Sequence, residues 1–247
     1  SATARFADGR LDLWIATQAP EQTRIAAARA IGISTEDVAL YPMPAGGSFD
    51  ARLEHDHAIE IALIARELAR DGPRPVQLVW PREQDFTHGQ YRPMAVVRAR
   101  AGLDANRAIS SWVYRNVSPS IQVQRGRLLG ATGDSQGSEG STALPYSFGS
   151  RLVEWVNQPT PVPVGYWRSV GHSVNTFAVE SMVDELAAAA GQDPLLFRKR
   201  FLTDSRWIAV LDAAAALGAW SSPLAAGTAR GIAIGRAVLV ASSRVDV

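Results

Sequence analysis

The residues from Pro163 to Gly191 read PVGYWRSVGHSVNTFAVESMVDELAAAAG. From Ser173 onward this stretch predicts a helix, because apolar residues recur at helical spacing and Gly191 can close the end. Four of the residues that share one side of this helix are Ala178, Met182, Leu186 and Ala189. Three acidic residues lie off that stripe, namely Glu180, Asp184 and Glu185.

A short loop places an aromatic side chain and a cation directly before this helix, at Trp167, Arg168 and Ser169. Free backbone N–H groups, the positive end of the helix dipole and a guanidinium together would make an anion-binding corner. By residue type alone, a core position for Trp167 and a surface ion pair for Arg168 are the commoner roles. Both interpretations stay open at this point.

Composition excludes several classes of protein. The 247 residues are 47% hydrophobic and 20% charged, with a net charge of +1 and no cysteine. This balance does not indicate disorder, and no polybasic block indicates a nucleic acid or an anionic membrane as partner. Without cysteine the chain can form no disulfide, iron–sulfur ligation or thiolate nucleophile, and four scattered histidines do not favour a zinc site.

The location in the cell is left open between cytoplasm and periplasm. No apolar run reaches the length needed to span a membrane, so we expect no membrane-spanning segment in this chain. The chain begins with Ser1 instead of Met, so an upstream segment is not excluded.

The beginning of the chain predicts a β-hairpin followed by a helix. Ala2–Phe6 and Arg10–Ile15 alternate apolar and polar residues around the turn residues Asp8-Gly9. Pro20 suits the first turn of a helix that runs to Gly32. Gln18 thus lies at a strand-to-helix junction, where by residue type an amide more often caps the helix or faces solvent.

A glycine pair follows the next predicted strand, Val38–Tyr41, and precedes a helix that extends to Arg70. Gly46 and Gly47 would let the backbone approach a ligand without Cβ obstruction, a common way to hold a phosphate or a dithiolene-bearing cofactor. As a bare pair the signal is weak, since most such pairs form turns.

The rest of the chain continues to mix strands and helices. We predict strands at 75–80, 96–101, 109–117, 151–156 and 230–240, a helical turn at 81–86 and a long surface loop at 118–150. Asp193-Pro194 caps a helix through Leu202, and a further helix covers 208–217. The fold class is therefore α+β, with two related halves in which hairpins and short strands pack against helices. We place the halves at residues 1–120 and 121–247. A doubly wound sheet is the alternative, although the hairpins favour antiparallel pairing.

Four groups of residues resemble one family: Thr17-Gln18, the loop from Gly46 to Arg52, Trp80–Glu83 with Tyr91–Pro93, and Trp167–Ser173 with its following helix. Together they resemble the molybdenum-binding subunits of the xanthine dehydrogenase and aldehyde oxidase family, nearest to the branch that includes isoquinoline 1-oxidoreductase. The resemblance covers nearly the whole chain from Ala2.

The resemblance implies a molybdopterin-dependent oxidoreductase. The implied activity is hydroxylation of an aldehyde or an aromatic N-heterocycle, with water as the oxygen source. A molybdenum–pterin cofactor, in the molybdopterin or the cytosine dinucleotide form, would accept two electrons. An iron–sulfur partner subunit would carry the electrons away from it. The implied partners are thus that subunit and a small-molecule substrate, with no nucleic acid.

The resemblance also assigns candidate site residues. In the family, a glutamine at the place of Gln18 hydrogen-bonds an oxo ligand of the metal, and the loops 46–50 and 167–171 cradle the cofactor. The cofactor-binding candidates are Gln18, Gly46, Gly47, Ser48, Phe49, Asp50, Trp167, Arg168, Ser169 and Gly171. Val170 and Leu53 are candidates for the substrate pocket, in place of an aromatic residue and a glutamate found in purine-oxidising relatives, so a purine substrate is not supported. No catalytic residue or direct metal ligand is assigned within this chain.

The chain departs from the family pattern in the glycine loop. That loop reads Gly-Gly-Gly-Phe-Gly followed by a basic residue in the family, whereas Ser48 and Asp50 replace two of the glycines here. An ionised Asp50 would meet an anionic cofactor unfavourably. Alternatively, Asp50 caps the helix that follows.

The family pattern also predicts that this chain is part of a larger subunit. A strand resembling Gly231–Gly235 leads, in the family, into a further domain that carries the general-base glutamate. We therefore expect the 247 residues to be inactive on their own. Two other functions stay open: a scaffold or interaction domain without the cofactor, and a small-anion-binding module that uses the glycine loop alone.

Overall fold

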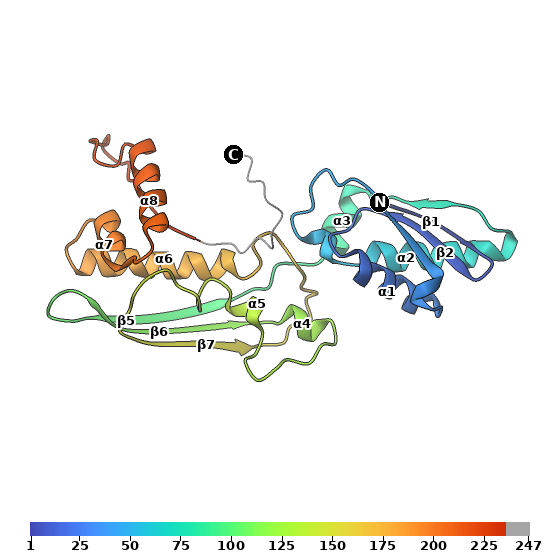
Figure 1. Cartoon of the computed structure of the whole chain (residues 1–247), viewed down its shortest axis with the longest axis horizontal. Helices are drawn as coiled ribbons and strands as arrows, with labels where there is room; N and C mark the ends of the chain where they lie inside the picture. The colour runs from blue at the N-terminus through green and yellow to red at the C-terminus, as the bar shows by residue number, and fades with distance from the viewer. Residues whose placement is uncertain (236–247) are drawn as a thin grey trace. The chain divides into compact units, whose positions relative to one another are not determined.

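The computed structural model describes residues 1–235, and these divide into two compact units. Unit 1 comprises Ser1–Arg92 and Pro161–Arg168, and unit 2 comprises Pro93–Thr160 and the residues from Ser169 onward. Each unit combines a small sheet with helices, so the predicted α+β class is confirmed (Figure 1).

Unit 1 begins with the predicted hairpin of β1 (Ala2–Ala7) and β2 (Arg10–Ile15). Asp8 and Gly9 form its two-residue turn, with φ angles of 51° and 77°. Positive φ at both positions is what the twist of a tight hairpin requires. The register places Ala4 opposite Leu13, and both side chains are fully buried.

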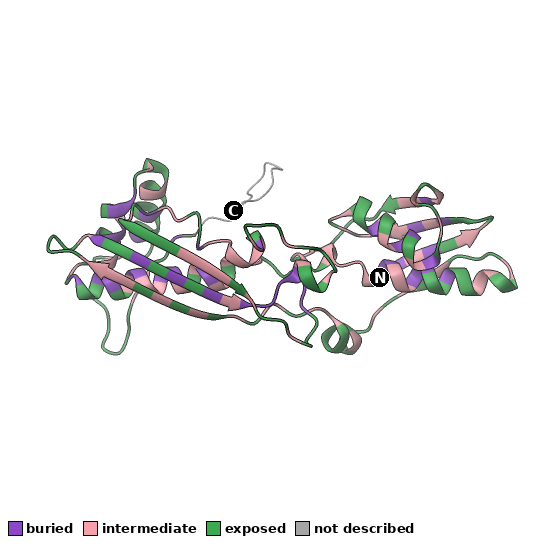
Figure 2. Ribbon diagram, turned by 90° about the horizontal axis from the view of Figure 1, so that it is seen from below, coloured by how far each residue is buried: buried purple, intermediate pink, exposed green. Residues whose placement is uncertain are grey.

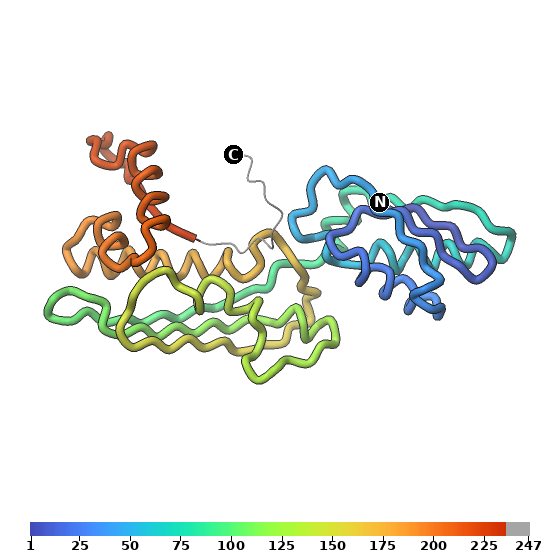
Figure 3. The backbone as a smooth tube through the Cα atoms, viewed as in Figure 1, coloured from blue at the N-terminus to red at the C-terminus, as the bar shows by residue number. Residues whose placement is uncertain are grey.

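The chain then crosses to a strand parallel to β2. The helix α1 (Pro20–Ile31) starts with proline in its first turn and ends at Gly32, whose φ of 67° closes it in the left-handed conformation. From there the chain, whose course Figure 3 traces, enters β3 (Val38–Pro42). This strand pairs in parallel with β2. The strand β4 (Val76–Leu78) pairs antiparallel with β1 and completes the sheet in the order β3-β2-β1-β4.

The core of unit 1 is built largely from small side chains. The helix α2 (Asp56–Leu68) packs on α1 and on β1, while α3 (Arg82–His88) is a short helix after β4. The two long helices approach closely because their buried contributions are small or branched: Ala27, Ala28 and Ile31 from α1, and Ala58, Ile61, Ala62 and Ala65 from α2. Small residues leave little room for enlargement, so this core is sensitive to added volume.

Unit 2 is organised around a three-stranded sheet of β5 (Val96–Leu103), β6 (Ile109–Ser118) and β7 (Ser150–Asn157). The long helix α6 (His172–Ala189) runs along one face of it (Figure 1). Trp112 and Tyr114 are buried, whereas their neighbours Val113 and Arg115 are exposed, so burial alternates along β6 (Figure 2). This period-2 pattern is that of a sheet covered on one face.

The boundary between the units differs from the division near Ser120 that the sequence predicted. The strand β6 pairs in parallel with β7 from Ser111 opposite Ser150 to Ser118 opposite Asn157. This pairing joins the residues on both sides of Ser120 into one sheet. As a result, residues 93–120 belong to unit 2, while the later segment 161–168 belongs to unit 1.

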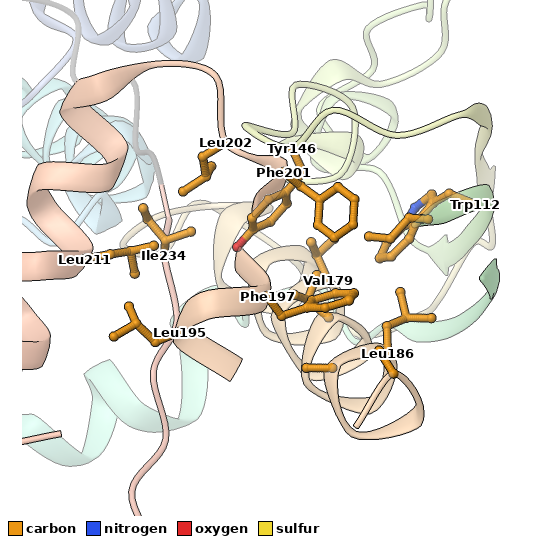
Figure 4. Close-up of a cluster of buried hydrophobic side chains, with 14 of the residues drawn as sticks. Trp112, Tyr146, Val179, Leu186, Leu195, Phe197, Phe201, Leu202, Leu211 and Ile234 are labelled. Atoms are coloured by element: carbon orange, nitrogen blue, oxygen red, sulfur yellow. The ribbon is translucent and has the colours of Figure 1, made fainter. Parts of the chain in front are cut away.

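Two further helices complete the core of unit 2. The helix α7 (Pro194–Phe201) is capped as predicted, because the Asp193 side chain accepts a hydrogen bond from the Leu196 N–H at 3.0 Å. It is followed by α8 (Ser205–Leu217). Figure 4 shows Tyr146, Phe197 and Phe201 gathered around Val179 of α6.

The buried side of α6 matches only part of the stripe that the sequence predicted, since Ala178 and Met182 are half-buried against the core. Leu186 is buried as expected, but Ala189 is exposed and the buried residues are Asn175, Val179, Glu180, Val183, Leu186 and Ala187. The prediction placed Glu180 off the buried side of the helix. Glu180 is only 4% exposed.

Glu180 is buried because it is the centre of an ion-pair network. Its carboxylate accepts hydrogen bonds from Arg198 Nε at 2.9 Å and from the Tyr146 hydroxyl at 2.8 Å. It also accepts one from the Ile234 N–H at 3.0 Å. Arg198 is fully buried and also donates to Asp184 at 2.6 Å. Burial and the Glu180 charge raise the pKa of Tyr146 far above its usual range, so its hydroxyl stays a donor.

The region 118–150 is more ordered than the predicted surface loop. It contains two short helices, α4 (Ile121–Gln124) and α5 (Ser135–Ser138). Asp134 is buried and accepts a hydrogen bond from the Ser120 hydroxyl. Asn175 of α6 donates to the carbonyls of Gly137 and Glu139 at 2.9 and 2.7 Å. The prediction missed this because the buried partner lies on a helix distant in sequence.

The strand predicted at 230–240 is absent over the described residues Arg230–Gly235, and its remainder lies outside the described residues. Within residues 1–235, no helix has the length and apolar character needed to cross a bilayer.

Replacing Arg198 by methionine should destabilise unit 2 strongly. The variant leaves Glu180 buried without its counter-charge, a change that typically lowers the free energy of unfolding by about 3–5 kcal/mol. As a control, Arg70→Met removes an exposed pair with Glu67 and should cost less than about 1 kcal/mol. Urea denaturation of both variants measures the difference, and equal losses would contradict the role given to this network.

Candidate functional site

The glycine loop adopts an unusual backbone. Gly47 has a φ of 139°, and the two following non-glycine residues, Phe49 and Asp50, have φ angles of 51° and 66°. Left-handed conformations are unfavourable for residues with a Cβ, and such strain is concentrated at functional sites. A Cβ on Gly46 would meet no atom within 4 Å, so the fold itself does not require glycine there.

The loop is held to the end of β2 by Arg52. Its guanidinium donates to the carbonyls of Gly47 at 3.4 Å and Ala16 at 3.3 Å. In return, the Arg52 carbonyl accepts the backbone N–H of Gln18 at 3.1 Å and the Thr17 hydroxyl at 3.2 Å. The Thr17-Gln18 pair therefore lies beside the glycine loop.

The exposed side chain of Gln18 does not cap α1. Its amide donates to the Asp50 carboxylate, Nε2 to Oδ1, at 3.2 Å. Asp50 in turn precedes the short 3₁₀ helix Ala51–Leu53 but makes no side-chain cap. The interpretation of Asp50 as a helix cap is therefore wrong, since its carboxylate is turned toward Gln18.

The segment 161–168 returns to unit 1 and is fixed there by backbone hydrogen bonds. The Tyr91 N–H donates to the Pro163 carbonyl, and the Gly165 N–H donates to the Tyr91 carbonyl, both at 2.9 Å. The Tyr166 N–H donates to Glu54 Oε1 at 2.8 Å. A Cβ on Gly165 would lie 2.4 Å from the same Glu54 oxygen and 2.5 Å from the Cβ of Gln90, so the packing favours glycine. Sequence reasoning did not single out Glu54 or Gly165.

This return brings Arg168 to the glycine loop. Its guanidinium carbon lies 4.3 Å from the centre of the Phe49 ring, which is a cation–π distance. The Arg168 carbonyl accepts a hydrogen bond from Arg92 Nη2 at 2.9 Å. Trp167 beside it is 41% exposed, so it is not the core residue that residue type alone favoured. Gln18, the loop 46–52, Trp167 and Arg168 thus gather in unit 1.

The charged side chains around this cluster of unit 1 are mainly positive. Burial and the neighbouring Arg168 charge lower the pKa of Arg92, while Asp50 acts in the opposite direction. An arginine remains protonated under such shifts, so Arg92 contributes a guanidinium. Guanidiniums and an amide are donors that suit an anionic group. Within residues 1–235, no group of three or more His, Asp or Glu side chains could hold a metal ion.

The remaining candidates of the loop 167–171, which are Ser169, Val170 and Gly171, belong to unit 2. Ser169 and Val170 have φ angles of 62° and 41°, and for a β-branched residue such as Val170 this is a marked outlier. Gly171 leaves no room for a side chain, because a Cβ would lie 2.1 Å from the Gln136 carbonyl oxygen. The turn is closed by the His172 N–H, which donates to the Ser169 carbonyl at 2.8 Å.

The two candidates for a substrate pocket lie in different units. Leu53 is half-buried at the end of the 3₁₀ helix in unit 1, and Val170 is half-buried before α6 in unit 2. A pocket shared by these two residues stays a prediction.

A family model described as the molybdopterin cofactor-binding domain matches residues 1–202. The chain belongs to this family. Among its relatives are a nicotinate dehydrogenase component of Pseudomonas putida KT2440 and the beta chain of isoquinoline 1-oxidoreductase from Brevundimonas diminuta, each 27% identical. The matches cover 89% and 92% of this chain but 19% and 29% of the relatives. The chain thus spans less than a third of these curated relatives.

Solved structures agree on the fold. The crystal structure of the aldehyde oxidoreductase from Desulfovibrio desulfuricans matches with a TM-score of 0.71 at 14% identity, over 89% of this chain and 25% of that one. At this identity the likeness shows the fold alone.

The residues of the candidate site in unit 1 suit the cofactor of this family, with one exception. The strained loop, the open space at Gly46, the Gln18 amide and the Arg92 and Arg168 guanidiniums would suit an anionic pterin phosphate. The exception is the Asp50 carboxylate, which adds a like charge.

The backbone at Asp50 leads to a stability prediction. Asp50→Gly should raise the free energy of unfolding by up to about 1 kcal/mol, because glycine adopts a φ of 66° without strain. Asp50→Ala should lower it, since alanine keeps the Cβ and loses the acceptor for Gln18. Thermal unfolding of the two variants separates these effects, and a fall in both would contradict the backbone assignment.

Proposed function

We propose that this chain is the cofactor-binding part of a molybdenum hydroxylase subunit that oxidises an aldehyde or an aromatic N-heterocycle, with water as the oxygen source. The observation that carries the proposal is the contact of Arg168 with Phe49 at 4.3 Å. Within unit 1 this contact links the loop 46–52, with its left-handed residues Phe49 and Asp50, to the distant segment 161–168. Family membership supplies the cofactor that such a site would hold.

The site residues of unit 1 each have a specific part in this proposal. The Gln18 amide would donate a hydrogen bond to the cofactor, and the backbone of 46–50 would lie against it without side-chain obstruction at the glycines. Arg168 and Arg92 would balance its negative charge. When bound, the molybdenum–pterin cofactor supplies the two-electron oxidation that the amino acids of this chain cannot perform.

The substrate class is inferred from the pocket candidates and the relatives. Leu53 of unit 1 and Val170 of unit 2 are both apolar, so neither candidate would bring a charge to a flat ring or an aldehyde. The names of the relatives, nicotinate dehydrogenase and isoquinoline 1-oxidoreductase, agree with an aromatic N-heterocycle. Both relatives are named as subunits, which supports a partner subunit. In this proposal that partner is an iron–sulfur subunit that accepts the electrons.

Two finer points belong to the same proposal. The cofactor is the molybdopterin or the cytosine dinucleotide form. The 247 residues without the rest of the subunit and its partner do not turn over substrate, since none of the site residues named here acts as a general base. Turnover of an aldehyde by the purified chain would contradict this point.

Gly46 offers the sharpest test of cofactor binding. The fold does not need glycine at this position, so Gly46→Ala should leave the melting temperature within about one degree of wild type or raise it slightly. If the loop lies against the cofactor, the added methyl group should lower the molybdenum content of the full-length protein several-fold. Elemental analysis of the protein purified with its partner subunit gives this content.

The matched control is Gly130→Ala, at another glycine with open space and no positive φ. It should change neither stability nor molybdenum. Equal molybdenum in the Gly46→Ala protein and wild type would refute the cofactor cradle. No molybdenum in the wild-type protein would instead favour the scaffold or the small-anion-binding module.

A further inference from the structure

Asp50 is a carboxylate surrounded by groups that bind anions. The Gln18 amide donates to it at 3.2 Å, and the Arg92 guanidinium is close enough for the Asp50 charge to act on it. The Arg168 guanidinium packs on the ring of Phe49, the residue that precedes Asp50. The backbone carbonyl of Arg168 accepts a hydrogen bond from Arg92. One amide and two guanidiniums thus lie around a single short loop.

The backbone holds Asp50 in this position at an energetic cost. Phe49 and Asp50 both adopt left-handed conformations, and Arg52 fixes the loop through hydrogen bonds to the Gly47 and Ala16 carbonyls. A side-chain cap of the following 3₁₀ helix does not explain the strain, because Asp50 makes none. The favourable interaction of the carboxylate is with the amide and the positive charges around it.

We propose that Asp50 is an internal anion that an incoming phosphate-type ligand replaces, and that Arg92 is a ligand-binding residue of this subsite together with Gln18 and Arg168. In the described state the carboxylate accepts the Gln18 hydrogen bond and offsets the guanidinium charge. A phosphate group that binds there takes over these interactions, and the Asp50 side chain turns away. Asp50 therefore lowers the affinity of the site for anions and makes it selective for the more highly charged ones.

This inference deepens the proposed function, because the phosphate of a pterin cofactor is one such ligand. It also assigns Arg92 a role that the sequence did not indicate. Free phosphate and a cofactor phosphate share the same chemistry. For this reason the test uses inorganic pyrophosphate as the probe and does not depend on the molybdenum centre.

The experiment is calorimetric titration of pyrophosphate into the full-length protein expressed without added molybdate. Asp50→Asn removes the charge but keeps the shape and tolerates the left-handed backbone, so it isolates the electrostatic effect. Its Kd should be about tenfold lower than that of wild type, as expected for removal of a like charge near a bound anion. Arg92→Gln should raise the Kd by about tenfold for the opposite reason.

Two control variants change the charge of unit 1 away from the site. Asp71→Asn and Arg74→Gln alter exposed residues and should each leave the Kd within about twofold of wild type, since exposed distant charges are screened. Melting temperatures of all four variants show whether they are folded. If Arg92→Gln fails to fold, the Asp50→Asn arm decides the inference alone.

The outcomes separate this inference from the proposed function. An unchanged or higher Kd in Asp50→Asn would overturn the inference, as would controls that shift by the same factor. A protein with the expected Kd changes that never contains molybdenum would refute the proposed function and leave the inference standing. A protein that contains molybdenum but whose pyrophosphate Kd is unchanged by Asp50→Asn would refute the inference and leave the proposed function standing.

Discussion

The candidate site depends on the attachment of the segment 161–168 to unit 1. Two backbone hydrogen bonds with Tyr91 and one between the Tyr166 N–H and the Glu54 carboxylate fix this segment. Glycine is favoured at position 165, because a Cβ there would lie 2.5 Å from the Cβ of Gln90 as well as 2.4 Å from the Glu54 oxygen. Without this attachment, Arg168 would not reach the Phe49 ring, and the glycine loop would have Gln18 and Arg52 but no second wall.

The site and the core rest on separate interactions. Unit 2 is stabilised by its aromatic core and the Glu180–Arg198 network, while the site of unit 1 depends on a strained loop and on exposed or half-buried polar groups. Strain at Phe49 and Asp50 must be balanced by the packing of α1 and α2 on the sheet below. For this reason the loop can vary in sequence, as Ser48 and Asp50 do, without loss of the fold.

Local signals in the sequence predicted the fold well, because each of them depends on nearby residues. The Asp8-Gly9 turn, the end of α1 at Gly32 and the Asp193 cap are decided within a few positions. Features that depend on distant partners were missed or misread. Glu180 is buried only because Arg198 meets it, the region around Asp134 is ordered because Asn175 binds it, and Glu54 and Arg92 matter only after segment 161–168 returns.

Hydrogen exchange of individual backbone amides tests the attachment of this segment most directly. We expect the amides of Tyr91, Gly165 and Tyr166 to be protected together in the wild-type protein, because all three donate hydrogen bonds within unit 1. Glu54→Ala should remove the protection of Tyr166 and weaken that of the other two. Exchange of these amides at the rate of an open loop in the wild-type protein would contradict the account, since Arg168 would then have no fixed place beside Phe49.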